Sequence, residues 1–162
     1  MSAAKELDTK RKAVQRGTKK KARTFTWKWF SKYVKNYRWH IDGDRHCISC
    51  GKDLNAVKIN LGHFVPKGAI DELWFKFKIC YLQCARCNMN QGNPAGYIMG
   101  LYKKIGVKGI MSLAQEAHRI MQTYDKARAW SNDQIIQEGE VFKQKYLRLA
   151  AALKAKGITP KF

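Results

Sequence analysis

Acidic residues are scarce in this chain of 162 residues. Only 12 Asp and Glu stand against 32 Lys and Arg, which gives a formal net charge of +20 at pH 7. Between Glu72 and Glu116 there is no acidic residue at all. A charge this far from zero makes the chain repel itself and attracts it to polyanions, so we expect nucleic acid as its partner.

Long apolar stretches are missing as well. The sequence has no run of about 18 apolar residues, the length that a membrane-spanning helix needs. Its charged beginning is not followed by the apolar segment of a secretory signal peptide. These absences argue against a membrane partner and predict a soluble protein of the cytoplasm. The hydrophobic content of 45% is enough for one modest core.

Residues 1–24 have few large apolar side chains. They contain nine basic and two acidic residues, with a basic cluster from Lys19 to Arg23. Such a segment cannot bury enough surface to order itself. We predict a disordered basic arm that follows DNA phosphates, with a merely solvated extension as the alternative.

Apolar residues at helical spacing follow this arm. The pattern predicts an amphipathic helix over residues 27–37 with lysines on its outer face. The apolar face of this helix consists of Trp29, Phe30, Tyr33, Val34 and Tyr37.

Four of the five cysteines stand in two Cys-x-x-Cys pairs. Each pair offers two thiolates from one tight turn, so two pairs fill the tetrahedral shell of a zinc ion and leave no place for water. We predict a structural zinc site, with an iron–sulfur centre as the alternative. The ligands are Cys47, Cys50, Cys84 and Cys87. Cys80 lies in an apolar run and is predicted to be a buried structural thiol.

The segment between the two cysteine pairs is predicted to be extended. Residues 57–65 alternate weakly in polarity and end at Pro66, which predicts a short hairpin or strand pair around His63. Residues 73–82 alternate aromatic or β-branched side chains with lysines. We expect them to form a further extended segment that leads to the second cysteine pair.

The C-terminal third carries helix signals. Asn93 can cap a helix that begins at Pro94 and ends near Gly106. An apolar stripe runs over residues 110–124 and another over 135–153. These stripes predict a helical hairpin.

The second stripe is preceded by a capping signal. Ser131 and Gln134 resemble a capping box, which predicts that the last helix begins here.

Zinc alone does not indicate catalysis, because zinc ribbons that only bind nucleic acid are common. This chain also has His63 between the cysteine pairs and Asn88 directly after the last cysteine. An imidazole can take a proton from water near neutral pH, and an amide oxygen is a hard ligand suited to Mg²⁺. From these residues alone, a non-catalytic zinc ribbon with a packed or solvent-facing histidine remains the alternative.

Several motifs stand in a fixed order from about Trp29 to Leu153. They are Trp29 to Val34, Cys47 to Gly51, Gly62-His63-Phe64, Gln83 to Asn88, Gly92-Asn93, Tyr97, Gly100 to Gly106, and Trp130-Ser131. In this order they resemble the lambdoid phage NinG/Rap recombination family. The central part is also similar to the HNH, or ββα-metal, nuclease fold, and in particular to the zinc-containing phage endonuclease VII.

The resemblance implies a structure-specific, Mg-dependent DNA endonuclease. Its substrates would be branched recombination intermediates such as Holliday junctions and D-loops. Carried over by motif, His63 would be the general base, and Asn88 would hold a catalytic Mg²⁺ or Mn²⁺ ion. The zinc would staple the hairpin to the helix that follows.

The resemblance also implies a fold and a domain organisation. We expect an α+β protein with a zinc-stapled HNH-like core over residues 25–106. A helical region over residues 107–162 would serve dimerisation and DNA binding. Branched DNA has two strands to cut, so we expect a homodimer. Other recombination proteins are expected partners, and the cytoplasm of the phage's host is the expected location.

One position departs from the nuclease pattern. Many HNH nucleases carry an acidic metal ligand directly before the base, where this chain has Gly62. Another carboxylate would then have to come from elsewhere in the sequence. The candidates are Asp42, Asp44, Asp53 and Asp71, and we prefer Asp44 as a ligand of the magnesium ion. As a turn former, Asp44 also has an ordinary structural explanation.

Basic residues fill the stretch that lacks acids, and they predict contacts with DNA phosphates. They are Lys76, Lys78, Arg86, Lys103, Lys104 and Lys108, with Lys67 shortly before them. Besides the zinc-ribbon accessory protein, a basic RNA- or ribosome-associated zinc module is the second alternative to the nuclease.

Overall fold

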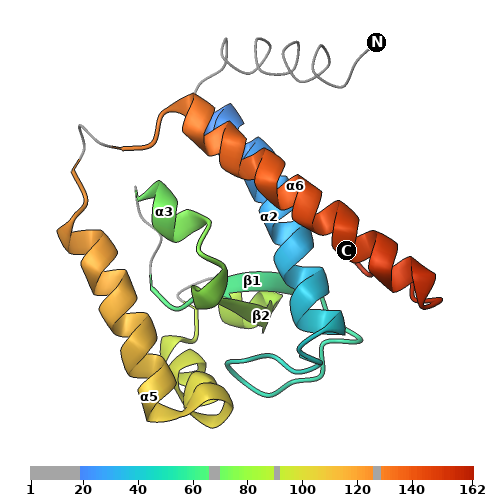
Figure 1. The fold of residues 1–162 in the computed structure, drawn as a ribbon. Coiled ribbons are helices and arrows are strands. Elements are labelled where there is room, and N and C mark those ends of the chain that lie inside the picture. The colour runs from blue at the N-terminus through green and yellow to red at the C-terminus, as the bar shows by residue number, and fades with distance from the viewer. Residues whose placement is uncertain (1–18, 66–69, 90–91, 126–128) are drawn as a thin grey trace, which may run out of the picture. The chain divides into compact units, whose positions relative to one another are not determined.

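The computed structural model describes residues 19–65, 70–89, 92–125 and 129–162 (Figure 1). It combines helices with one small antiparallel sheet, which agrees with the predicted α+β class. The elements are α2 (Lys19–His40), β1 (Ile59–His63), α3 (Asp71–Trp74), the 3₁₀ helix η1 (Phe77–Ile79), β2 (Cys80–Cys84), α4 (Ala85–Asn88), α5 (Pro94–Gln122) and α6 (Asn132–Ala155). Among the described residues, no helix is both long enough and apolar enough to span a membrane.

The chain forms two compact units. One comprises the described residues of Met1–Tyr33 and Arg128–Phe162, and the other those of Val34–Ala127. We call them the helical unit and the sheet unit. This division differs from the predicted one, which separated residues 25–106 from 107–162. The boundary lies inside α2, so one helix contributes residues to both units.

Helix α2 is longer than the predicted helix over residues 27–37. It begins at Lys19, so the disorder predicted for residues 1–24 is wrong for residues 19–24. Lysine, arginine and alanine are good helix formers, and their helix propensity outweighs the repulsion between the lysines and the arginine at the start of α2. The rest of the predicted arm, residues 1–18, lies outside the described part of the chain.

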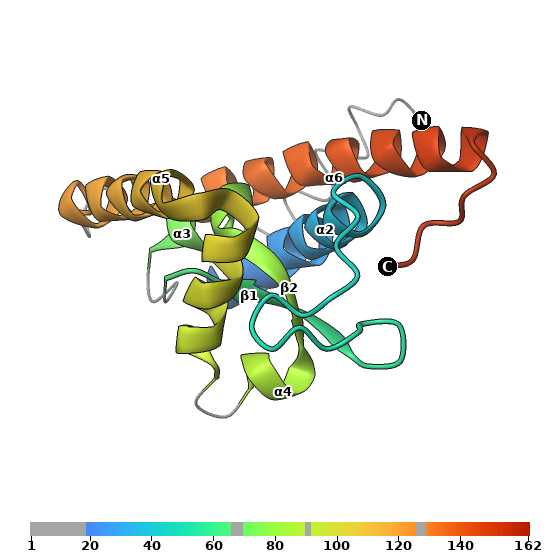
Figure 2. The same ribbon diagram turned by 90° about the horizontal axis from the view of Figure 1, so that it is seen from below.

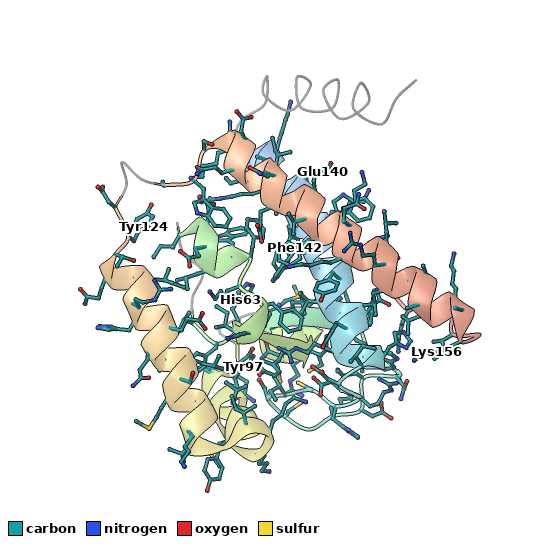
Figure 3. The ribbon with its side chains drawn as sticks, in the orientation of Figure 1. His63, Tyr97, Tyr124, Glu140, Phe142 and Lys156 are labelled. Atoms are coloured by element: carbon teal, nitrogen blue, oxygen red, sulfur yellow. The ribbon has the colours of Figure 1, made fainter. Side chains whose placement is uncertain are left out.

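Aromatic side chains hold the helical unit together. Phe142 of α6, labelled in Figure 3, packs edge-on against Phe30 of α2, with ring centroids 4.8 Å apart. Phe30 is fully buried. Trp29 and Tyr146 form a second ring pair at 5.9 Å. Helix α6 thus packs on residues of α2 that belong to the same unit. The preceding helix α5 belongs to the sheet unit, so the expected helical hairpin stays a prediction.

The backbones of α2 and α6 also approach closely. The hydroxyl of Thr26 donates a hydrogen bond of 2.6 Å to the Ile135 carbonyl, and Gly139 lies against Phe25 and Thr26 so tightly that a Cβ there would clash. At the start of α6, the predicted capping box of Ser131 is confirmed.

The sheet of the other unit consists of β1 and β2. They pair in antiparallel register from Ile59 opposite Cys84 to His63 opposite Cys80. All five residues of β2 are buried. The strand pair around His63 is thus confirmed, but the two strands are distant in sequence.

The segment between the strands corrects one expectation. Residues 73–79 were predicted to be extended, yet they contain part of α3 and all of η1. Here Leu73 and Ile79 are both buried, and two short helical turns achieve this burial. The alternation of apolar and polar residues over so short a segment did not distinguish a strand from short helical turns. Strand β2 therefore begins only at Cys80.

Arg38 lies in the part of α2 that belongs to the sheet unit, and it binds the backbone at the start of β2. No pattern in the sequence predicted this role. The Arg38 guanidinium donates to the carbonyl oxygens of Cys80 and Phe77 at 3.1 and 3.3 Å. It also forms an ion pair of 2.6 Å with Asp42 and lies 4.0 Å from the ring centroid of Tyr81. A buried arginine that is satisfied in this way fixes the position of the strand beside it.

Helix α5 changes direction at Gly106, as Figure 2 shows. This residue has φ +67° and ψ 179°, which interrupts the helix where its end was predicted. At the beginning of α5, the side chain of Asn93 accepts a hydrogen bond of 3.0 Å from the Gly96 amide, and Pro94 follows. The predicted cap is therefore confirmed.

Candidate metal centre and adjoining cavity

The four paired cysteines meet at one point of the sheet unit. The sulfur atoms of Cys47, Cys50, Cys84 and Cys87 all lie within 4.8 Å of one another. In a tetrahedral zinc–thiolate site with bonds of about 2.3 Å, the sulfurs would be about 3.8 Å apart. The distance of 3.9 Å between Cys50 and Cys84 matches this value. The cluster therefore fits a structural metal ion such as zinc.

Local backbone structure presents the first pair. The Gly51 amide donates to the Cys47 carbonyl at 2.9 Å, and Gly51 has φ +71°, so the chain turns tightly after Cys50. Flanking this turn, the backbone of His46 forms a bridge with Asp53. The second pair needs no such loop, because Cys84 ends β2 and Cys87 lies in α4.

Helix α5 closes over the first pair through two glycines. A Cβ at Gly100 would lie 1.7 Å from the Ile48 carbonyl oxygen, and one at Gly96 would lie 2.2 Å from the Ser49 carbonyl oxygen. The side-chain amide of Asn93 donates to the same Ser49 carbonyl at 3.3 Å and lies 3.9 Å from the Cys87 sulfur. The helix cap thus also supports the metal cluster.

The gathered thiols perturb one another. Burial, together with the thiols of Cys50 and Cys84, raises the pKa of Cys87 to about 12. Burial also raises the pKa of Cys47. For Cys84 burial acts in the same direction, but hydrogen bonds from Cys87 and the other thiols outweigh it and lower the pKa. A cluster of this kind favours a cation that replaces the thiol protons.

Cys80 does not belong to the cluster. It is fully buried at the start of β2, as predicted for a structural thiol.

A cavity of about 360 Å³ adjoins the cluster and contains both predicted catalytic residues. His63 comes from the end of β1 and Asn88 from the end of α4. Their chain positions are distant, and the antiparallel register together with α4 brings them to one cavity. The residues that line it are His63, Phe64, Gln83, Cys87, Asn88, Gly92, Asn93, Pro94, Tyr97 and Ile98.

A backbone carbonyl orients the histidine ring. His63 Nε2 lies 3.2 Å from the carbonyl oxygen of Trp74 in α3 (Figure 3 labels His63). A carbonyl only accepts, so Nε2 carries the proton of this hydrogen bond. In the neutral ring, Nδ1 is then the basic nitrogen.

Tyr97 fixes the wall of the cavity. Its hydroxyl donates to the carbonyl oxygens of Gly62 and Ile79, each at 3.0 Å, and the side chain is buried. Burial raises the pKa of this phenol well above its usual value, so it remains a donor at neutral pH. The first turns of α5 are thereby held against the ends of β1 and η1.

The acidic candidates for a second metal ligand lie elsewhere. Asp44 forms an ion pair with Lys104 and lines a different cavity, next to the first cysteine pair. Asp42 is paired with Arg38, and Asp53 accepts hydrogen bonds from Asn55. Asp71 is buried in the first turn of α3. In the part of the chain that the structure describes, no carboxylate lines the cavity of His63 and Asn88.

The basic residues of the acid-free stretch are not all unopposed. Lys76 forms an ion pair of 2.8 Å with Glu116 and lies 3.9 Å from Glu72, while Lys104 is paired with Asp44. These acids come from outside the stretch, so a count along the sequence missed them.

The other predicted DNA contacts are exposed on the sheet unit. They are Lys78, Arg86, Lys103 and Lys108. Arg86 shares a cavity of about 510 Å³ with Lys52 and Lys58, two cations that the prediction did not include. The remaining predicted contact, Lys67, lies outside the described residues.

Comparison with known proteins identifies the family. The model of the family described as "Bacteriophage Lambda NinG protein" matches residues 2–150. The chain therefore belongs to the NinG family. We found no match among curated proteins and none among solved structures.

Proposed function

We propose that this member of the NinG family is a metal-dependent endonuclease that cuts branched DNA recombination intermediates, such as Holliday junctions and D-loops. The observation that carries the proposal is the shared cavity of His63 and Asn88, which adjoins the cysteine cluster. The antiparallel pairing of β1 with β2 and the helix α4 directly after β2 are consistent with an HNH-like core, although α3 and η1 lie between the two strands.

His63 is the general base of the proposed reaction. With Nε2 bound to the Trp74 carbonyl, the neutral ring is basic at Nδ1, and we assign the uptake of a proton from the attacking water to this atom. Asn88 offers an amide oxygen, a hard ligand that suits Mg²⁺ or Mn²⁺. Such an ion, when bound, would supply positive charge to the scissile phosphate and the leaving oxygen.

The cysteine cluster holds zinc in this proposal, and its role is structural. Four thiolates complete the zinc coordination, so no site remains for water or substrate. The metal fixes the end of β2 and helix α4, and through them Asn88.

Charge supports a nucleic-acid substrate. The chain carries a net charge of +20, and Lys78, Arg86, Lys103 and Lys108 are exposed on the unit that contains the cavity. Branched DNA presents two strands for cutting, and we propose a homodimer in the host cytoplasm, acting together with other recombination proteins.

The test is a cleavage panel of four-way junction, D-loop, flap and linear duplex in Mg²⁺ or Mn²⁺. We expect the wild type to cut the branched substrates. His63→Ala should reduce the rate by at least about 100-fold. Asn88→Ala should abolish cutting while zinc content and junction binding persist. His118→Ala, a change at an exposed histidine of α5 that does not line the cavity, is the matched control.

Two results would refute the nuclease proposal. Intact substrates with the wild type would indicate a non-catalytic zinc-binding accessory protein if the junction is nevertheless bound. Undiminished cutting by His63→Ala would exclude the proposed base. Tighter binding to structured RNA than to junction DNA would favour an RNA-associated module.

A further inference from the structure

Gly62 has no room for a side chain. A Cβ at this position would lie 1.8 Å from Gln83 Oε1 and 2.8 Å from the Tyr97 ring. Both neighbours are buried and held by hydrogen bonds. An acidic residue directly before His63 is thus incompatible with this packing, and the space is taken by an amide oxygen of another residue.

Two hydrogen bonds determine the orientation of the Gln83 amide. Its Nε2 donates to the Ser49 hydroxyl at 2.6 Å and to the Cys87 carbonyl at 3.4 Å. A carbonyl cannot donate, so the nitrogen must face Cys87 and the oxygen must face away from it. Among the described residues, neither hydrogen bond of this side chain uses Oε1.

Gln83 lines the same cavity as His63 and Asn88. Gln83 is only 4% exposed, so packing against its neighbours fixes the position of its side chain. Because both hydrogen bonds of the amide use its nitrogen, the oxygen can serve as a ligand for a group bound in the cavity.

The other oxygen-bearing side chains of the cavity have structural roles. Asn93 Oδ1 accepts from the Gly96 amide at the start of α5, and the Tyr97 hydroxyl donates to two carbonyls. As noted above, no carboxylate lines the described part of the cavity. Gln83 and Asn88 therefore remain as the two neutral oxygen donors.

We propose that Gln83 is the second protein ligand of the catalytic divalent cation, taking the place that an acid before His63 would fill. The proposal rests on the nuclease function proposed above. Amide oxygens suit Mg²⁺ and Mn²⁺, which accept few protein ligands together with water and phosphate oxygens. Two neutral ligands bind such an ion weakly, so DNA phosphates complete the site.

The test is Mn²⁺ binding to the zinc-loaded, full-length protein without DNA, measured by electron paramagnetic resonance. Gln83→Met keeps the length of the side chain and removes the oxygen, so affinity should fall about 10-fold. Gln83→Glu adds a negative charge at the same place and should raise affinity about 10-fold. Asn60→Ala is the matched control, because Asn60 pairs with Gln83 across the sheet and does not line the cavity.

Equal Mn²⁺ affinity in wild type, Gln83→Met and Gln83→Glu would overturn the proposal. If Gln83→Met loses zinc, the Gln83→Glu variant decides: tighter binding supports the ligand role, and unchanged binding refutes it. Binding and cleavage fail separately. A wild type that binds Mn²⁺ through Gln83 but cuts no DNA refutes only the nuclease function, and one that cuts while both variants bind Mn²⁺ normally refutes only the ligand.

Discussion

The two units of the chain gain their order from different sources. The helical unit consists of long helical segments that bury aromatic rings such as Phe30 and Phe142 against one another. The sheet unit contains the long helix α5 and most of the described buried core, but its cysteine cluster and cavity are built largely from two strands of five residues each and short helical turns. Helices can gain stability from packing alone, whereas an isolated two-stranded sheet is marginal in water.

This difference bears on how the candidate site is stabilised. The cavity with His63 and Asn88 lies between the end of a strand and a short helix, elements that are weak by themselves. Metal ligation can make such elements rigid. Short elements that are weak by themselves can therefore carry a well-defined site.

Removal of the metal should produce the largest difference in stability between the two units. Structural zinc contributes on the order of 10 kcal/mol in small domains, so chelation or Cys87→Ser should unfold the sheet unit. Amides of α6 should retain much more protection than those of β2, because the packing of Phe142 on Phe30 involves no cysteine. Hydrogen exchange with mass spectrometry measures both, and zinc content is determined in parallel.

Cys80→Ala is the control for this experiment. This cysteine is buried in β2 outside the cluster, so its loss should leave zinc stoichiometry unchanged. Equal loss of protection in α6 and β2 on chelation would contradict independent sources of order. An unchanged melting curve for Cys87→Ser would contradict the staple itself.

Phe142→Ala should destabilise the helical unit and leave the sheet unit intact. Truncation of a buried phenylalanine costs about 3–5 kcal/mol, and here it removes the ring that packs on Phe30. We expect faster exchange in α6 with zinc content intact. Val141→Ala serves as the control, because the neighbouring valine is 41% exposed and its truncation should be almost neutral. Loss of zinc in Phe142→Ala would show that the units are coupled.

Local signals in the sequence were sufficient for several features of both units. The spacing of the cysteine pairs predicted their cluster, and the Asn93 cap, the interruption at Gly106 and the Ser131 capping box follow from the chemistry of one or two residues. Each depends on backbone geometry within a few residues. Such features need no knowledge of the rest of the fold.

Features that depend on distant packing were not predictable in the same way. The contact of Arg38 with the Cys80 carbonyl and that of Gln83 with Gly62 exist only once β2 lies beside α2 and β1. Residues 19–24 were predicted to be disordered because they have few large apolar side chains, yet their high helix propensity lets α2 begin at Lys19. In the candidate site, the positions of His63 and Asn88 relative to the cysteine pairs drew attention to both residues, and the family resemblance supplied their expected roles.

The ion pair of Lys76 and Glu116 joins two such distant positions inside the sheet unit, and it should give the smallest effect. A hydrogen bond from Lys76, followed by the attraction of this and other cations, lowers the pKa of Glu116. A carboxyl whose folded pKa is depressed stabilises the fold above its unfolded pKa, and this contribution is lost as the pH falls through the folded pKa. Both side chains are 25% exposed, so the gain should be below about 1 kcal/mol.

Glu116→Gln should therefore lower stability slightly at pH 7 and have no effect under acidic conditions where the carboxyl is protonated. Denaturant unfolding of wild type and variant at both pH values measures the difference. The control is Glu140→Gln, which removes a comparable ion pair with Lys143 in the helical unit. The ion pair connects Lys76, which lies just after α3, to Glu116 in α5. Glu116→Gln should therefore change hydrogen exchange in α3 and α5 and leave that of α6 unchanged. An effect that persists unchanged at low pH would assign the stabilisation to packing of the side chain and not to its charge.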